Sequence, residues 1–249
     1  MSQLTAELPA VEEFLSEGLI TEVLSTIKSG KEAAAYLCRA GRELGPKYVV
    51  AKVYHERNQR NFNRDTIYQE GRVILNGQIA RAVAKKTEMG REAQAAMWVD
   101  YEYEALCALF DAGADVPEPF ACTGQALLME YVGERDTAAP QLQSASLTRE
   151  EAEAALERLR WNVRLFLSHN LVHGDLSAFN VLWHRGRAIV IDFPQAVDPR
   201  FAPAARSLLE RDLKNLSRYF SRHQIAFDAQ AEAERLWDDF RFDRVADGL

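Results

Sequence analysis

Three side chains in the second half of the chain have the types and spacing that phosphoryl transfer needs. Asp175 and Asn180 lie in the segment LVHGDLSAFN, and Asp192 follows an apolar run in VIDFPQ. One carboxylate can orient an attacking hydroxyl and accept its proton, while an amide oxygen and a second carboxylate can hold Mg²⁺ against phosphate oxygens. A hairpin predicted over 181–191 would bring Asn180 and Asp192 to the same cleft. The alternative is that these residues only cap turns, but that leaves their combination unexplained.

A lysine inside an apolar strand is the second chemical feature. Lys52 lies in KYVVAKVY, whose β-branched and aromatic residues predict a strand, so its charge must be paired or reach solvent. Glu102 lies on the apolar stripe of a helix expected over 91–111, where a carboxylate is costly without a cation. We therefore predict a Lys52–Glu102 pair. Asp100 and Glu104 are rivals that project away from the stripe.

The elements that must position these side chains follow from hydrophobic periodicity. Apolar spacing over 8–24 predicts one or two short helices, and a strand near 33–39 should pair with the Lys52 strand. Residues 125–132 predict another strand. Thr148 and Glu151 form a capping box that opens a long helix. Two more helices are expected, over 203–220 and 226–240.

This order of elements predicts an α+β fold with two unequal lobes. We expect an N-terminal helical extension over 1–23, a small lobe of sheet plus helix over 24–130, and a mainly helical lobe over 131–249. The hinge between the lobes should lie near Gly133, where an apolar strand gives way to a polar stretch.

Two weaker features concern nucleotide binding. The segment SGKEA has one glycine, and it matches neither G-x-G-x-x-G nor the Walker A pattern, so taken alone it indicates a surface turn. The strand end MEYV, 129–132, could offer its backbone to adenine, because such bonding needs few particular side chains.

The order of the motifs resembles the RIO family of atypical serine/threonine protein kinases. The resemblance covers residues 24–222 and rests on SGKEA, AKVY, WVDYEYEAL, AGADVPEP, LLMEYVG, LVHGDLSAFN, IDFPQAVD and ERDLKNL. It implies a two-lobed protein-kinase-like fold and an ATP- and Mg²⁺-dependent (or Mn²⁺-dependent) enzyme. Such an enzyme would transfer the ATP γ-phosphate to a protein hydroxyl, act as an ATPase switch, or do both.

The resemblance also implies a role for each motif residue. Asp175 would be the catalytic aspartate, and Asn180 and Asp192 would be the metal ligands. In this family the aspartate at the position of Asp192 can itself become phosphorylated during ATP hydrolysis. Lys52 would contact the α- and β-phosphates and pair with Glu102. The remaining ATP-binding residues would be the phosphate-covering loop and the adenine contacts: Ser29, Gly30, Lys31 and Glu32, then Met129 as gatekeeper, and Glu130 and Val132.

Departures from ordinary protein kinases keep other functions open. The segment after Asp192 has neither a DFG glycine nor an A-P-E motif, so the substrate is not apparent. A small-molecule phosphotransferase of the aminoglycoside or choline kinase type also carries an HGD loop, although Ser177 stands where that type usually has histidine. The third possibility, a non-catalytic pseudokinase, is disfavoured because the motif residues are all present.

Charge and composition bound the partners and the compartment. The 249 residues carry a net charge of −7, yet the segment 57–91 holds eight basic and three acidic residues, a net charge of +5. This segment could contact ribosomal RNA or be a solvated loop. No apolar run of about 18 residues and no leader peptide is apparent, which predicts a soluble cytoplasmic protein without a membrane partner. The three cysteines, Cys38, Cys107 and Cys122, are expected to be buried.

Overall fold

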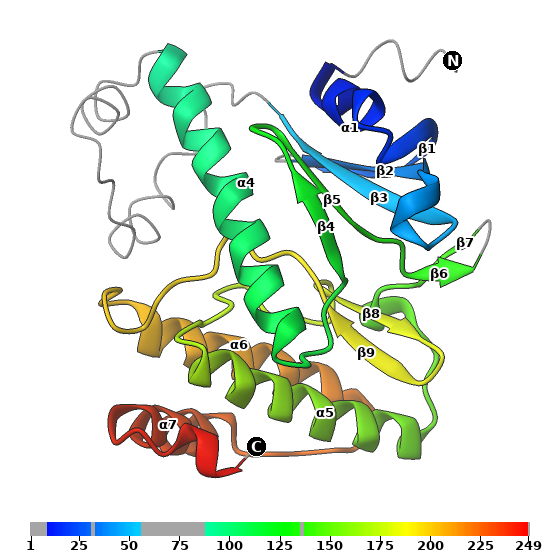
Figure 1. Cartoon of the computed structure of the whole chain (residues 1–249). Coiled ribbons are helices and arrows are strands. Elements are labelled where there is room, and N and C mark those ends of the chain that lie inside the picture. The colour runs from blue at the N-terminus through cyan, green and yellow to red at the C-terminus, as the bar shows by residue number, and fades with distance from the viewer. Residues whose placement is uncertain (1–8, 31–32, 56–87, 135–136, 249) are drawn as a thin grey trace. The chain divides into compact units, whose positions relative to one another are not determined.

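The computed structural model describes residues 9–30, 33–55, 88–134 and 137–248, and of residues 9, 88–98, 247 and 248 it describes the backbone alone. These residues form two compact units, shown in Figure 1. Unit 1 contains the described residues up to 55 together with 88–107 and 117–138, and unit 2 contains 108–116 and 139–248.

Unit 1 is built on a five-stranded antiparallel sheet with the strand order β1-β2-β3-β5-β4. The strands are β1 (Ile20–Ser29), β2 (Ala33–Ala40), β3 (Tyr48–Tyr54), β4 (Pro119–Cys122) and β5 (Ala126–Glu130). The predicted β2–β3 hairpin and the β5 strand are confirmed. The sequence did not indicate β4, a short edge strand that begins at a proline.

The N-terminal helix ends earlier than its apolar spacing predicts. A 3₁₀ turn (Pro9–Val11) and α1 (Glu12–Ser16) are helical, but residues from Ile20 onwards form β1, so the helix expected up to 24 is wrong beyond α1. Gly18 stops the helix with a φ of 72°, a conformation that glycine adopts without a Cβ penalty. The β-branched residues of ITEVLSTI then favour a strand, and β2 supplies its hydrogen-bonding partner.

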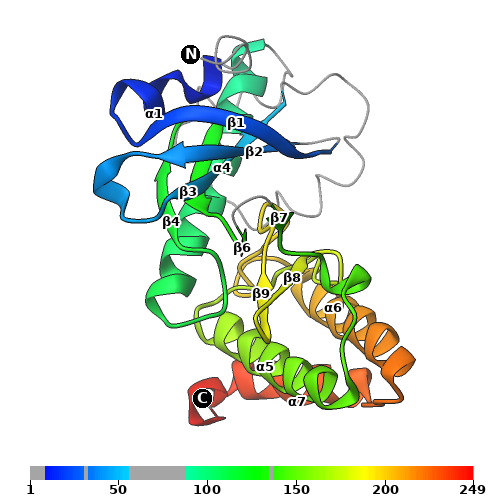
Figure 2. The same ribbon diagram turned by 90° about the vertical axis from the view of Figure 1, so that its right-hand side faces the viewer.

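Alternation along β3 gives the sheet of unit 1 two different faces. Val49, Ala51 and Val53 pack with Phe14 of α1 in a hydrophobic core on one face. Lys52 belongs to the opposite set of side chains, because neighbouring residues of a strand point to opposite faces. The helix α4 (Glu88–Asp111) runs across that opposite face (Figures 1 and 2). The sheet therefore separates an apolar core from the side that carries the lysine.

Unit 2 is mainly helical, as predicted. Its helices are α5 (Arg149–Ser168), α6 (Ala205–Phe220) and α7 (Ala229–Arg241). It also contains a hairpin in which β8 (Val181–His184) pairs with β9 (Arg187–Val190). The capping box at the start of α5 is confirmed, since Thr148 and Glu151 each bond the other's backbone N–H at 3.2 and 2.8 Å. The buried faces of the helices surround fully buried side chains such as Leu159, Phe166 and Phe220.

Three smaller findings complete the fold. The short strands β6 (Gly133–Glu134) and β7 (Thr137–Ala138) pair where the sequence indicated a polar hinge stretch. Cys38 is buried as expected, but the burial predicted for Cys107 and Cys122 is wrong, because both are half-buried. None of the helices within the described ranges is long and apolar enough to cross a membrane.

Candidate active site

A buried ion pair joins the Lys52 strand to α4 in unit 1. The Lys52 Nζ atom donates to both carboxylate oxygens of Glu102, at 2.8 and 3.0 Å. Tyr54, two residues further along β3, also donates its hydroxyl to this carboxylate. Glu102 is only 1% exposed, so the three hydrogen bonds replace the water that the carboxylate lost on folding.

The predicted Lys52–Glu102 pair is confirmed, and the helix periodicity explains the choice of partner. Glu102 shares the buried face of α4 with Val99, Leu106 and Leu109, while Asp100 and Glu104 are exposed. A carboxylate on a buried helix face must find a cation, whereas an exposed one remains in water.

Burial also fixes the protonation state of Tyr54. It raises the pKa of the Tyr54 hydroxyl well above its usual value, and the neighbouring Glu102 carboxylate adds to that rise. The hydroxyl therefore stays protonated and remains a hydrogen-bond donor at physiological pH. The sequence analysis did not single out Tyr54, although its spacing from Lys52 on a strand places both side chains on one face.

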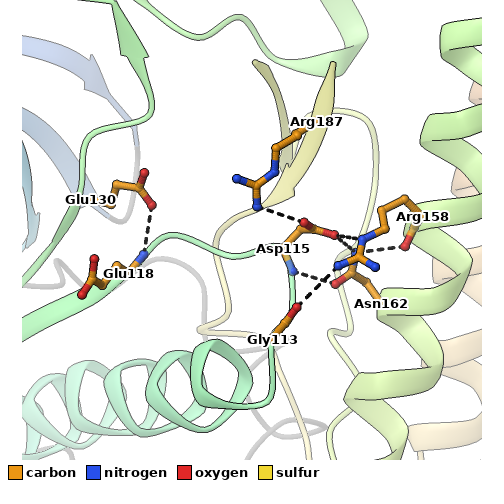
Figure 3. A network of polar contacts seen from close by, with 7 residues as sticks. All are labelled: Gly113, Asp115, Glu118, Glu130, Arg158, Asn162 and Arg187. Atoms are coloured by element: carbon orange, nitrogen blue, oxygen red, sulfur yellow. Dashed lines mark hydrogen bonds and ion pairs between the residues drawn. The ribbon is translucent and has the colours of Figure 1, made fainter. Parts of the chain in front are cut away.

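The residues expected to contact adenine lie at the end of β5. Val50 and Lys52 pair with Met129 and Leu127, so Met129 lies on the same face of the sheet as the lysine. The Glu130 N–H donates to the carbonyl oxygen of Glu118 at 2.8 Å, and the Glu130 carboxylate accepts from the Glu118 N–H at 3.3 Å (Figure 3).

Val132 lies just beyond the last residue of β5. In the part of the chain that the structure describes, its N–H donates to no backbone carbonyl. A backbone donor in this position is consistent with the predicted contact to adenine.

The phosphate-covering loop is only partly described. Ser29 ends β1 and pairs with Ala34, and the Gly30 N–H donates to the Ala33 carbonyl at 2.9 Å, which closes a tight turn. Lys31 and Glu32 lie outside the described residues. Ser29 and Gly30 are both exposed.

In unit 2, the loop after α5 brings Asp175 and Asn180 together. The Asn180 amide nitrogen donates to the backbone carbonyl of Asp175 at 2.8 Å and to its side-chain carboxylate at 3.2 Å. This arrangement fixes the orientation of the Asn180 amide and turns its oxygen away from the Asp175 carboxylate. Asp175 itself is exposed, which its expected contact with a substrate hydroxyl would require.

Asp192 follows β9 and lies next to Asn180 in the backbone pairing. Val181 pairs with Val190, and the Ile191 N–H donates to the Asn180 carbonyl at 2.9 Å. The predicted hairpin is thus confirmed, and its open end carries Asn180 and Asp192. Asp192 has a φ of 75°, a left-handed conformation that is strained for a residue other than glycine.

His173 is a structural residue of the loop. It is 2% exposed, its ring lies 4.7 Å from that of Phe193, and its Nε2 atom lies 3.2 Å from the Ile191 carbonyl oxygen. Burial lowers its pKa, so the ring is neutral at physiological pH. It connects the segment before Asp175 to the segment before Asp192.

Asp212 is the important residue of this site that the sequence analysis missed. This α6 side chain is 2% exposed and accepts the backbone N–H groups of Gly174 and Leu176, at 2.8 and 2.9 Å. Burial raises its pKa to about 7. Asn215, one turn along α6, donates to the Leu176 carbonyl at 3.1 Å, so α6 holds both residues that flank Asp175. The missed signal was an aspartate on the apolar stripe of a helix, the same signal that identified Glu102.

The donor atoms of unit 2 fit a magnesium ion. Carboxylate and amide oxygens are hard ligands, and Mg²⁺ is usually bound by one or two carboxylates together with substrate phosphates and water. Asn180 and Asp192 supply such a set at the open end of one hairpin, with Asp175 bonded to Asn180. The described residues contain no group of three or more His, Cys, Asp or Glu side chains that could hold a metal by themselves.

Comparisons with known proteins identify the family to which this chain belongs. The sequence model of the RIO domain matches residues 38–233. The RIO-type serine/threonine-protein kinase Rio1 of Haloferax volcanii is 30% identical over 249 residues, which are 98% of this chain and 77% of the relative. Rio1 of Thermoplasma acidophilum is 34% identical over 184 residues, 74% of this chain and 90% of the relative. The match to human serine/threonine-protein kinase RIO1, at 30% identity, covers 86% of this chain but only 36% of the human protein.

Solved structures show the same fold. The Rio2 kinase of Chaetomium thermophilum in a complex with ADP, Mg²⁺ and phosphoaspartate aligns with a TM-score of 0.66 at 20% identity, over 99% of this chain and 76% of that one. A second structure of this Rio2 kinase gives a TM-score of 0.65 at 23% identity. With the family match over most of the chain, these findings confirm the predicted kinase-like fold, and the chain belongs to the RIO family of serine/threonine-protein kinases.

Proposed function

We propose that this chain transfers the γ-phosphoryl group of ATP, in the presence of Mg²⁺, to a hydroxyl of a protein substrate. The observation that carries the proposal is the arrangement of unit 2, where Asn180 is bonded to Asp175 on one side and to the segment of Asp192 on the other. Asp175 is the group that orients the attacking hydroxyl and accepts its proton. We also propose the lobe boundaries that the sequence analysis expects, at residues 24 and 131.

Each remaining residue has a role in binding or orientation. Asn180 and Asp192 would hold Mg²⁺, which when bound neutralises charge on the phosphate oxygens. Lys52, oriented by Glu102, binds the α- and β-phosphates, and the loop of Ser29, Gly30, Lys31 and Glu32 covers the triphosphate. Met129 lines the base pocket, and the backbone of Glu130 and Val132 bonds adenine.

ATP hydrolysis through the protein itself is part of the proposal. In the Rio2 complex from Chaetomium thermophilum, ADP and Mg²⁺ occur together with a phosphoaspartate. In this chain the Asp192 carboxylate would attack the γ-phosphorus and release ADP, which leaves an acyl phosphate. Water would then hydrolyse the acyl phosphate to inorganic phosphate and restore the carboxylate.

The decisive experiment incubates the purified full chain with labelled ATP and Mg²⁺, comparing the wild type with Asp175→Ala and Asp192→Ala. We expect turnover by the wild type, none by Asp192→Ala, and retained ATP binding without protein-hydroxyl labelling in Asp175→Ala. Hydroxylamine removes label from an acyl phosphate but not from a phosphoserine, so it separates the two routes. The absence of both hydrolysis and transfer by the wild type would contradict the proposal, as would rapid phosphorylation of a small alcohol with no protein labelling.

The partner beyond ATP remains a separate hypothesis. The basic segment 57–91 lies outside the described residues up to residue 87 and is described only in its backbone from 88 onwards. Its net charge of +5 in an acidic chain suits a ribosomal RNA contact. Such a partner is compatible with the cytoplasmic location that the sequence analysis expects. Neutralising Arg81, Lys85 and Lys86 should then weaken RNA binding and leave ATP turnover intact. Unchanged RNA binding with lowered ATP turnover would contradict this assignment.

A further inference from the structure

A buried carboxylate to which the sequence analysis gave no role, Asp115 of the AGADVPEP motif, holds the β8–β9 hairpin. Asp115 follows α4 and is 5% exposed. Its side chain accepts hydrogen bonds from two residues of α5, Arg158 and Asn162 (Figure 3). The bond from the Asn162 amide nitrogen is 2.8 Å long. It also accepts one from Arg187, the first residue of β9, at 3.1 Å.

The backbone of Asp115 takes part in the same network. Its N–H donates to the Asn162 amide oxygen at 2.8 Å, and its carbonyl accepts the N–H of Val190, the last residue of β9, at 2.8 Å. Asp115 therefore contacts both ends of β9 and ties the strand to α5. Burial by itself would raise the pKa of Asp115, but the hydrogen bonds from Asn162, Arg158 and Arg187 outweigh it and hold the pKa below its usual value.

The strained conformation of Asp192 explains why β9 needs such support. A non-glycine residue with a φ of 75° persists only where the surrounding structure holds it on both sides. On the C-terminal side, Phe193 is fully buried against Phe166 and His173, with ring centroids 5.6 and 4.7 Å apart. On the N-terminal side, the chain is held by two backbone bonds, from Val190 to Asp115 and from Ile191 to Asn180.

We propose that Asp115 is a positioning residue for Asp192: it fixes β9 against α5 and so keeps the strained aspartate in the conformation that binds the metal. This inference rests on the proposed function, because it takes Asp192 as a metal ligand. Residues that hydrogen-bond a metal ligand orient it, and their loss typically weakens metal binding by about 10- to 100-fold. Asp115 acts through Val190, two residues before Asp192, so we expect the low end of this range.

A second buried carboxylate, also bonded to an arginine of α5, offers a matched control. Glu232 of α7 is 7% exposed and accepts from Arg160 of α5 at 2.7 Å, with Arg235 of α7 at 3.7 Å. Its substitution breaks a similar buried ion pair of unit 2 between α5 and α7. Any effect that Glu232→Gln shares with Asp115→Asn therefore reports general stability and not the position of β9.

The experiment compares the full-length wild type with Asp115→Asn, Arg187→Ala and Glu232→Gln, using two readouts. The first, without metal or nucleotide, is the hydrogen-exchange rate of the Val190 and Ile191 amides, which we expect to rise by about 10-fold or more in Asp115→Asn because β9 opens more often. The second is the Mg²⁺ concentration that gives half-maximal ATP turnover, which should rise by about 10-fold.

Arg187→Ala keeps the test valid if Asp115→Asn folds poorly. The Arg187 side chain is 66% exposed, so its removal leaves the core intact and removes the side-chain bond between the hairpin and Asp115, while the backbone bond from Val190 remains. We expect changes of about three-fold in both readouts, in keeping with a partly exposed ion pair. Glu232→Gln should leave the Mg²⁺ dependence unchanged, and it should change the exchange rates of the Val190 and Ile191 amides only as far as it lowers the global stability of the protein.

Two results separate the possible failures. Equal exchange and equal Mg²⁺ dependence in Asp115→Asn and Glu232→Gln would overturn the positioning role of Asp115. A wild type without Mg²⁺-dependent turnover would instead overturn the proposed function, and it would do so whatever the amide-exchange rates of β9 are.

Discussion

Breaking the Lys52–Glu102 pair should destabilise the protein far more than removing both charges together. In Glu102→Gln, the Lys52 ammonium stays in a site where its side chain is 12% exposed and loses the carboxylate that accepts two hydrogen bonds from it. Removing one partner of a buried pair costs about 3–5 kcal/mol, because the remaining charge is left without compensation. The low end applies here, since the glutamine amide oxygen can still accept one hydrogen bond.

The reverse variant, Lys52→Met, leaves a carboxylate that is 1% exposed and has lost its bonded ammonium but keeps the hydrogen bond from the Tyr54 hydroxyl, and we expect a cost of about 4 kcal/mol. The double variant Lys52→Met/Glu102→Leu removes both charges and replaces them with apolar side chains of similar size. Its main cost is the unsatisfied Tyr54 hydroxyl, about 1–2 kcal/mol. The double variant should therefore be destabilised less than either single variant, although each of those removes only one of the two charges.

Urea unfolding followed by circular dichroism measures these costs. With a slope of about 2 kcal/mol per molar urea, Glu102→Gln should lower the midpoint by about 1.5 M and the double variant by less than about 1 M. Glu104→Gln, an exposed position on the same helix, is the matched control and should shift the midpoint hardly at all. Additive costs in the double variant, or a loss under about 1 kcal/mol in either single variant, would refute the assignment of a buried, mutually compensating pair.

Three further outcomes follow from single contacts. Tyr54→Phe removes one donor to Glu102 and should cost about 1 kcal/mol in urea unfolding while raising the KM for ATP more than it lowers kcat; an unchanged KM would mean that the hydroxyl does not orient the pair. Thr148→Ala removes the cap of α5 and should cost about 1 kcal/mol, seen as a lower thermal midpoint that Thr148→Ser restores. Asp212→Asn tests the raised pKa of about 7: between pH 4 and pH 7 the folded wild type retains a proton that the unfolded chain has lost, so its stability relative to the variant should fall as the pH rises. Urea midpoints of both proteins at pH 5 and pH 8 check the sign. If the stability of the wild type relative to the variant instead rises with pH, the two backbone N–H bonds lower the pKa of Asp212 more than burial raises it.

The sequence predicted the elements whose signal is local. The β3 strand around Lys52, the capping box of α5 and the β8–β9 hairpin each depend on the residues within one short segment, and all are found. The helix expected up to residue 24 failed because apolar residues at three- and four-residue intervals fit a helix, whereas β1 forms only because β2 pairs with it. Strand pairing is a long-range property that helical spacing does not reveal.

The candidate site divides along the same line. Glu102 was predicted because a carboxylate on an apolar helix stripe must have a cation, and Asp175, Asn180 and Asp192 because their residue types suit phosphoryl transfer. The same argument applied to α6 would have identified Asp212. Its partners, however, are backbone N–H groups of a loop 36 and 38 residues away. Every non-proline residue has such a group, so the sequence does not indicate which ones Asp212 binds.

By itself, the sequence determined the chemistry: the charged and amide side chains, their order, and the strand and helices that carry most of them. Only the tertiary structure decided which groups hold those side chains in place. Asp115 bonds to residues that are 43, 47 and 72 positions away in the sequence, and no local sequence pattern predicts these contacts. The physical reason is that a buried polar group must be satisfied by whatever donors folding brings to it, and those donors come from segments far apart in the chain.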